Sequence, residues 1–168
     1  MYKAISFKCD KILGQLVLFL DKYRMRKWKL NPLGFNKNLD ESFFLDLWES
    51  VKCDANREVD KIEKSTGHVI DKNWMDDLAL RIQVVKKDSD ISYHHGRVLY
   101  SFLSEYIRKS SASSLNIVET GTARGFSALC MAKALSDSNV FGKIVTFDIL
   151  PHASPIYWNN VTDTTIGK

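Results

Sequence analysis

Two glycines in one short run carry the clearest chemical signal of this sequence. The run Glu119-Thr-Gly121-Thr-Ala-Arg-Gly125-Phe-Ser127 lies between a short β-branched segment and a helical one. A glycine at such a turn can adopt positive φ and lets a ligand approach the backbone, and Gly125 should let the helix pack close to the strand. The following helix presents free N–H groups and a positive dipole end, which suit a carboxylate or a phosphate. The run therefore predicts a binding site for an anionic group.

Two acidic residues end the segments on either side of that helix. Glu119 closes residues 115–119, and Asp148 closes residues 143–148. If the two segments are neighbouring parallel strands, roughly 4.8 Å apart, both acids face the crevice where open α/β sheets bind ligands. Asp148 lies 27 residues after Gly121. This spacing is loosely compatible with the acid that binds a ribose about 20 residues after such a turn.

One βαβ unit would position these residues. The two β-branched segments flank a helix predicted over residues 125–135, and the whole unit spans residues 115–148. This length is typical of a right-handed crossover between parallel strands. Neither segment alternates polar and apolar residues, so we expect helices on both faces of the sheet.

The chain before this unit is predicted to be helical. Apolar residues at helical spacing, with Asp40 as one cap, indicate four helices. Their expected ranges are residues 4–28, 41–64, 73–87 and 93–109. In the last helix we expect a buried face of Val98, Leu99, Phe102, Leu103, Tyr106 and Ile107. The breakers between elements are residues 31–34, 65–67 and 110–114.

The glycine spacing separates two kinds of ligand. Position 123 is Ala, where the dinucleotide fingerprint G-x-G-x-x-G needs glycine, so the pattern is E-x-G-x-x-x-G. This pattern resembles the first motif of class I S-adenosylmethionine-dependent methyltransferases. Residues 117–132 are similar to the group of these enzymes whose motif runs E-T-G-T-x-x-G-x-S, residues 142–148 resemble their second strand, and residues 150–158 are similar to the segment that follows.

The resemblance implies an α/β fold and a cofactor. A helical N-terminal region, residues 1–112, would cover the substrate side, and residues 113–168 would begin a Rossmann-like domain. S-adenosylmethionine would bind with its ribose on Asp148 and its methionine portion at the loop. The implied cofactor-binding residues are Glu119, Thr120, Gly121, Thr122, Gly125, Ser127 and Asp148. The implied reaction is in-line attack on the sulfonium methyl by an oxygen, nitrogen or carbon of a small-molecule acceptor, chiefly through positioning, with no catalytic residue identified.

The resemblance covers only residues 115–168, which is two strands and one helix. A complete methyltransferase sheet has seven strands, so we expect a truncated domain. The open edge of such a sheet favours association with other copies of the chain.

Two other functions remain open from the sequence. A nicotinamide-dependent oxidoreductase fragment shares the acid after the second strand but normally has the third glycine. A non-catalytic helical interaction module with a vestigial βαβ unit would need neither ligand.

Several other residues have two interpretations each. His94 and His95 point in different directions on a helix, so we expect no shared metal, and one of them could face a ligand. Arg124 could pair with a cofactor carboxylate or face water. Cys130 is predicted to lie in the core rather than act as a nucleophile. Trp48, Trp74 and the helix over residues 93–109 could shape the acceptor pocket, and His152 is expected in a loop.

Composition excludes several protein classes. The chain of 168 residues is 45% apolar and 26% charged, which fits a globular protein. Its net charge of +4, concentrated in residues 1–114, is too small to indicate nucleic-acid binding. Three widely spaced cysteines predict neither disulfides nor zinc, and no apolar run approaches the roughly 18 residues of a membrane span. We therefore expect a cytoplasmic protein.

Overall fold

The computed structural model describes residues 13–20, 22–23, 39–150 and 160–162. A short helix occupies residues 13–20. The elements after it are α2 (Glu41–Cys53), α3 (Arg57–Thr66), α4 (Lys72–Ile82), α5 (Tyr93–Ser110), β1 (Ser114–Thr120), α6 (Phe126–Asp137) and β2 (Phe141–Phe147). The predicted α/β arrangement is confirmed: a helical N-terminal region leads into a parallel β1–α6–β2 unit.

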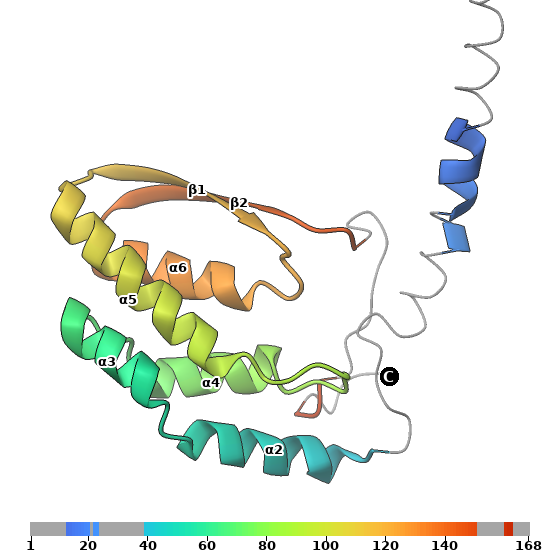
Figure 1. The fold of residues 1–168 in the computed structure, drawn as a ribbon, viewed down its shortest axis with the longest axis horizontal. Helices are drawn as coiled ribbons and strands as arrows, with labels where there is room; N and C mark the ends of the chain where they lie inside the picture. Colours follow the sequence, from blue (N-terminus) through green and yellow to red (C-terminus); the bar gives the residue numbers. More distant parts are fainter. Residues whose placement is uncertain (1–12, 21, 24–38, 151–159, 163–168) are drawn as a thin grey trace, which may run out of the picture.

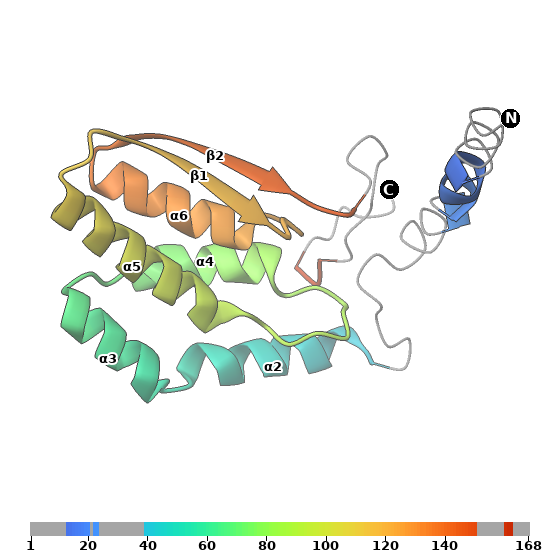
Figure 2. The ribbon, with the colours of Figure 1, turned by 45° about the horizontal axis from the view of Figure 1, so that its top comes forward.

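The sheet has helices on one face among the described residues. β1 and β2 pair in parallel, with Val118 opposite Val145 at their centre. Figures 1 and 2 show α5 and α6 beneath the same face, with α2, α3 and α4 beyond them. Side chains of β1 alternate strictly between exposed and half-buried. The expectation of helices on both faces is therefore wrong for this part of the chain, because the apolar residues of the second face are left exposed.

Side-chain caps begin three of the helices. Asp40 accepts a hydrogen bond from the Phe43 N–H at 3.1 Å, as the predicted cap of α2. Asn56 caps α3, and Asp71 caps α4 by accepting from the Trp74 N–H at 2.7 Å. The single helix predicted over residues 41–64 is wrong, because extended backbone at Asp54 and the Asn56 cap divide it in two.

The helix predicted over residues 73–87 ends earlier, at Ile82. Val84 and Val85 are buried beyond its end. Val85 forms an antiparallel bridge with Asn160, and the Val161 N–H donates to the Val84 carbonyl at 3.2 Å. These two valines therefore lie in an extended segment, which pairs with residues 160 and 161 from beyond β2.

The buried face of α5 differs from the predicted one. Phe102 and Tyr106 point outward and are 53% and 57% exposed. Ile107 is buried as predicted, and Val98, Leu99 and Leu103 are half-buried. The other buried residues of α5 are Tyr93, Gly96, Tyr100, Ser101 and Ser104. A Cβ atom on Gly96 would lie 2.6 Å from Met75 Cε and 2.7 Å from Cys130 Sγ, so the glycine lets α5 approach α4 and α6 closely.

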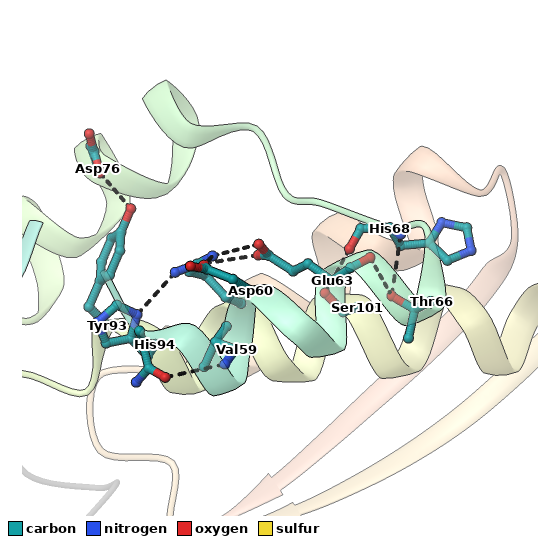
Figure 3. A network of polar contacts seen from close by, with 11 residues as sticks. Val59, Asp60, Glu63, Thr66, His68, Asp76, Tyr93, His94 and Ser101 are labelled. Carbon is teal, nitrogen blue, oxygen red and sulfur yellow. Dashed lines mark hydrogen bonds and ion pairs between the residues drawn. The ribbon is translucent and has the colours of Figure 1, made fainter. Parts of the chain in front are cut away.

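A charged network joins α3 to α5 (Figure 3). The Arg97 guanidinium donates to both carboxylate oxygens of Glu63, at 2.9 and 2.5 Å, and to Asp60 at 2.7 Å. Ser101 donates to the His68 carbonyl at 2.7 Å. Because Glu63 is buried, its pairing with Arg97 prevents the cost of an isolated buried charge.

No described helix is long and apolar enough to cross a membrane. The predictions for residues 31–34 and His152 lie outside the described residues, as do most of residues 150–158 and the ends of the helix predicted over residues 4–28.

Candidate functional site

The loop of residues 121–125, the glycine loop, joins β1 to α6. Gly121 has φ 86° and Gly125, the N-cap of α6, has φ 81°, so the predicted positive φ at the turn is confirmed. A Cβ atom on either glycine would meet no atom within 4 Å. The expectation that Gly125 allows close packing of helix on strand is therefore wrong: the left-handed backbone, not space, favours glycine there.

Two hydrogen bonds hold the glycine loop against the end of β2, and a third lies within the loop. The Gly121 N–H donates to the Phe147 carbonyl at 2.7 Å, which extends the parallel pairing by one residue. The Ala123 N–H donates to Asp148 Oδ2 at 2.6 Å. Within the loop, the Gly125 N–H donates to the Thr122 carbonyl at 2.7 Å. The loop is thus shaped before any ligand binds.

Asp148 is exposed, and both of its carboxylate oxygens contact backbone. Oδ2 accepts from Ala123, and Oδ1 accepts from the Leu150 N–H at 2.8 Å. An ionised carboxylate offers about four acceptor positions, so each oxygen retains a lone pair for a further donor. Its role toward a ribose stays a prediction, and the structure adds a role in holding the glycine loop.

Glu119 lies on the helix-covered face of the sheet, where the first turn of α6 meets β1. The Ser127 hydroxyl donates a hydrogen bond to Glu119 Oε1. The other oxygen, Oε2, is buried and has no hydrogen-bond partner in the part of the chain that the structure describes. A buried carboxylate oxygen without a donor is costly, so it marks a place where a ligand donor would be favourable.

A pocket of about 190 Å³ opens at the amino end of α6. Its lining residues are Gln83, Ser92, His95, Gly121, Thr122, Ala123, Arg124, Phe126 and Ser127. Glu119 and Asp148 do not line it, but each bonds to a residue that does, Ser127 and Ala123 respectively. The predicted site residues other than Thr120 thus gather around one pocket, from both strands and the helix between them. Thr120 does not line the pocket and lies on the exposed face of β1, opposite Phe147 of β2.

The segment between α4 and α5 supplies the opposite wall of this pocket. Gln83 Oε1 accepts from the Ser92 N–H at 3.4 Å and from Lys87 Nζ at 3.0 Å, which closes that segment into a loop. Sequence reasoning missed Gln83 and Ser92, since neither stands in a motif. The sequence predicts that either His94 or His95 could face a ligand, and His95 is the one that lines the pocket.

The two neighbouring histidines point in different directions, as predicted. His94 turns away from the pocket: its Nδ1 lies 3.2 Å from Arg97 Nη1, and its Nε2 lies 3.6 Å from Asp54 Oδ2. Burial lowers the pKa of His94, and the positive charge of Arg97 lowers it further. His94 therefore belongs to the helical network and His95 to the pocket.

Arg124 and Cys130 are held by the helical core. Arg124 Nη1 lies 3.4 Å from the Ile82 carbonyl, to which it donates, so the side chain connects the glycine loop to the end of α4. Cys130 is fully buried, and burial raises the pKa of its thiol to about 12. The prediction of a core cysteine is confirmed.

The two tryptophans proposed for an acceptor pocket lie in other surroundings. Trp48 is buried in the helical core, with its ring 5.5 Å from that of Tyr93. Trp74 has Lys133 Nζ 5.8 Å from its ring, which joins α4 to α6. Neither lines the pocket at the glycine loop, because the α2 and α4 faces that carry them turn toward other helices.

A larger cavity of about 580 Å³ lies among α2, α3, α4 and α5. Its charged groups already have partners: Arg97 binds Glu63, and Lys72 lies 2.8 Å from Asp76. Tyr93 also donates to Asp76 at 2.7 Å, and burial raises the pKa of this phenol. We therefore assign these charges to helix packing rather than to a ligand.

The described residues contain no cluster of metal-binding side chains. Across residues 13–20, 22–23, 39–150 and 160–162, no group of three or more His, Cys, Asp or Glu side chains could hold a metal ion. Comparison of the chain with protein-family models, curated proteins and solved structures found no match.

Proposed function

We propose that this chain binds S-adenosylmethionine at the glycine loop and belongs to a methyltransferase that acts on a small-molecule acceptor. The carrying observation is the E-x-G-x-x-x-G run at the turn from β1 into α6, with Glu119 near the end of β1 and Asp148 directly after the parallel strand β2. Open α/β sheets bind ligands at this place, outside the carboxyl ends of the strands.

The residues present fit the methionine end of the cofactor. That end carries an ammonium and a carboxylate group. The unpartnered Glu119 Oε2 suits an ammonium donor, and the amino end of α6, which has no side-chain cap, suits a carboxylate. The pocket of about 190 Å³ is smaller than the roughly 300–1,000 Å³ of whole-ligand pockets, so it suits one end of the molecule.

The chemistry that the cofactor supplies when bound is an electrophilic sulfonium methyl group. The chain contributes positioning: Asp148 would orient the ribose while it holds the glycine loop, and Glu119 would orient the ammonium. His95 lines the same pocket, so it is the group we propose to accept a proton from an acceptor hydroxyl or amine.

The proposal is tested by titrating the chain with S-adenosylmethionine, with its demethylated product and with NAD. We expect saturable binding of the first two and none of NAD. Glu119→Gln keeps the size of the side chain but removes its charge, so it should weaken binding about tenfold or more. Glu49→Gln, on the exposed face of α2, is the matched control and should bind like the parent.

Two results would contradict the proposal. Binding of NAD in preference to S-adenosylmethionine would favour the oxidoreductase interpretation. Failure of the folded chain to bind any of the three ligands would favour an interaction module.

A further inference from the structure

The helix over residues 13–20 is apolar on every side and stands apart from the sheet and the other helices (Figures 1 and 2). At 3.6 residues per turn, Leu13, Leu18 and Phe19 point to three different sides of it. Each large apolar side chain of this helix is at least 49% exposed: Leu13, Leu16, Val17, Leu18, Phe19 and Leu20. Exposed apolar surface of this extent is typical of a site that binds a protein or a membrane.

The nine residues that follow this helix, residues 21–29, carry the whole net charge of the chain. Their charged residues are one acid, Asp21, and five bases, Lys22, Arg24, Arg26, Lys27 and Lys29. Of the 24 basic and 20 acidic residues in the chain, 19 of each sign therefore lie elsewhere, and the rest of the chain is neutral as a whole. A local charge of +4 beside an apolar helix favours an anionic partner that also has an apolar interior.

The surface of an anionic lipid bilayer has both properties. Apolar side chains of a short helix can enter the acyl region, while the long stem of Lys22 keeps its ammonium among the phosphate groups. Tyr23, which is 70% exposed, has an apolar ring and a polar hydroxyl, and tyrosine is enriched at this depth of a membrane. A nucleic acid would neutralise the basic residues but leave the leucines in water, and a groove on a protein would cover one side of the helix.

The length of the helix suits the membrane surface rather than a crossing. Eight helical residues extend about 12 Å, whereas the hydrocarbon core of a bilayer is about 30 Å thick. The sequence has Lys11 shortly before the helix and Asp21 directly after it, so charged groups at both ends favour the headgroup level. An isolated helix of this length is only marginally stable in water, and apolar contact with lipid would stabilise it.

We propose that the helix over residues 13–20 binds the surface of an anionic phospholipid membrane, with the basic residues after it supplying the electrostatic attraction. Burial of a few apolar side chains and attraction by a basic cluster are each weak, and together they give stable attachment. This inference is independent of the proposed function.

Sedimentation of the chain with lipid vesicles tests the electrostatic part. We expect binding to vesicles of equal parts phosphatidylcholine and phosphatidylserine, and at least tenfold weaker binding to phosphatidylcholine alone. Arg24→Gln with Arg26→Gln should weaken binding to the mixed vesicles about thirtyfold. The matched control, Lys61→Gln with Lys64→Gln on the exposed side of α3, removes the same charge and should bind like the parent.

A second pair of variants tests the apolar part. Leu16→Asp should weaken binding to the mixed vesicles at least tenfold, because a carboxylate cannot enter the acyl region without a large cost. Phe141→Asp places the same charge on the sheet, at a residue that is 86% exposed, and should bind like the parent. Both side chains lie outside the packed core, so circular dichroism should show an unchanged fold.

Each other result overturns the proposal. Equal binding to both kinds of vesicle, or an equal loss in the two double glutamine variants, would show that the basic residues after the helix have no special role. Loss of binding in Phe141→Asp but not in Leu16→Asp would show that the sheet contacts the lipid. No sedimentation of the folded chain, with concentration-dependent association that Leu16→Asp abolishes, would show that a second copy covers the helix.

Discussion

At the residue scale, Asp148 holds the glycine loop and is also the residue that we propose to bind the ribose. It accepts hydrogen bonds from Ala123 in the glycine loop and from Leu150 beyond β2. Position after a strand was enough to suggest the ribose contact, because that contact depends on a general property of the fold. The bond to Ala123 could not be predicted, since it depends on the exact path of the loop.

Replacement of Asp148 separates these two roles. Asp148→Ala should weaken S-adenosylmethionine by on the order of 1.5–3 kcal/mol for each charge-assisted hydrogen bond lost. Free methionine, which lacks the ribose, should lose less affinity than S-adenosylmethionine in calorimetric titrations, because for methionine only the loop contact to Ala123 is removed. An equal loss for both ligands would mean that Asp148 acts only by holding the glycine loop.

The role of Gly121 in cofactor binding can be tested by comparison with Gly67, a glycine outside the glycine loop that also has positive φ. Gly121→Val should abolish cofactor binding and leave the helical circular-dichroism signal intact, because a β-branched residue disfavours φ 86° and the loop must change shape. Gly67→Val is the control: Gly67 has φ 74° at the end of α3, with equally open surroundings. If both variants bind like the parent, the glycine loop is not the site.

At the scale of the elements, local signals predicted more than periodicity did. The β-branched runs predict the ends of β1 and β2 to within two residues. Composition and length are sufficient here, because buried parallel strands are short, continuous runs of apolar residues. The gap between α2 and α3 was missed, although Asn56 is a good N-cap, because apolar residues continue on both sides of it. Val84 and Val85 looked helical and are extended, because a distant residue, Asn160, pairs with them.

The face of α5 shows why burial is difficult to read from apolar residues alone. Gly96, Ser101 and Ser104 face the core since small residues let helices approach, whereas Phe102 faces outward. Dependence on helix packing also explains why only part of the candidate site could be predicted from the sequence. Its contiguous part, from Gly121 to Ser127, was predicted, but the wall with Gln83 and Ser92 depends on how α4 and α5 pack.

Gly96 provides the test of this packing. Gly96→Ala would gain helix propensity, but its Cβ would lie 2.6 Å from Met75 and 2.7 Å from Cys130, which are both buried. We expect a net loss of about 1–3 kcal/mol in the free energy of unfolding, measured with urea. In a Met75→Ala background, Gly96→Ala should cost less than in the parent, because the contact with Met75 Cε is gone. A stabilised Gly96→Ala chain would contradict the close approach of α5 to α4 and α6.

At the scale of the whole molecule, stability should fall in alkaline solution. Burial raises the pKa of Cys130 to about 12, and burial and a hydrogen bond to Asp137 raise the pKa of Tyr100 to about 12. The unfolded chain loses these protons near pH 9 and 10, so above that it binds fewer protons than the folded chain. The free energy of unfolding then decreases as pH rises toward 12.

The alkaline loss can be assigned by substitution. Urea unfolding from pH 8 to 11 should give a slope that Cys130→Ala reduces, although this variant also creates a small cavity. A slope that is unchanged in Cys130→Ala would show that the thiol titrates normally in the folded chain. An increase in stability over this range would contradict the account for both groups.

Self-association through the open sheet, expected from the sequence, stays a prediction at the scale of the whole molecule. The concentration dependence of the sedimentation coefficient distinguishes extensive association from a monomer.

The central claim is that the glycine loop binds S-adenosylmethionine, and nuclear magnetic resonance tests it most directly. Backbone amide shifts of the ¹⁵N-labelled chain are followed as the cofactor is added. The account predicts saturable shifts concentrated in residues 119–127, at Asp148 and at His95, with the amides of α2 and α3 unchanged. Saturable shifts confined to the cavity among α2, α3, α4 and α5, or no saturable shift at all, would contradict it.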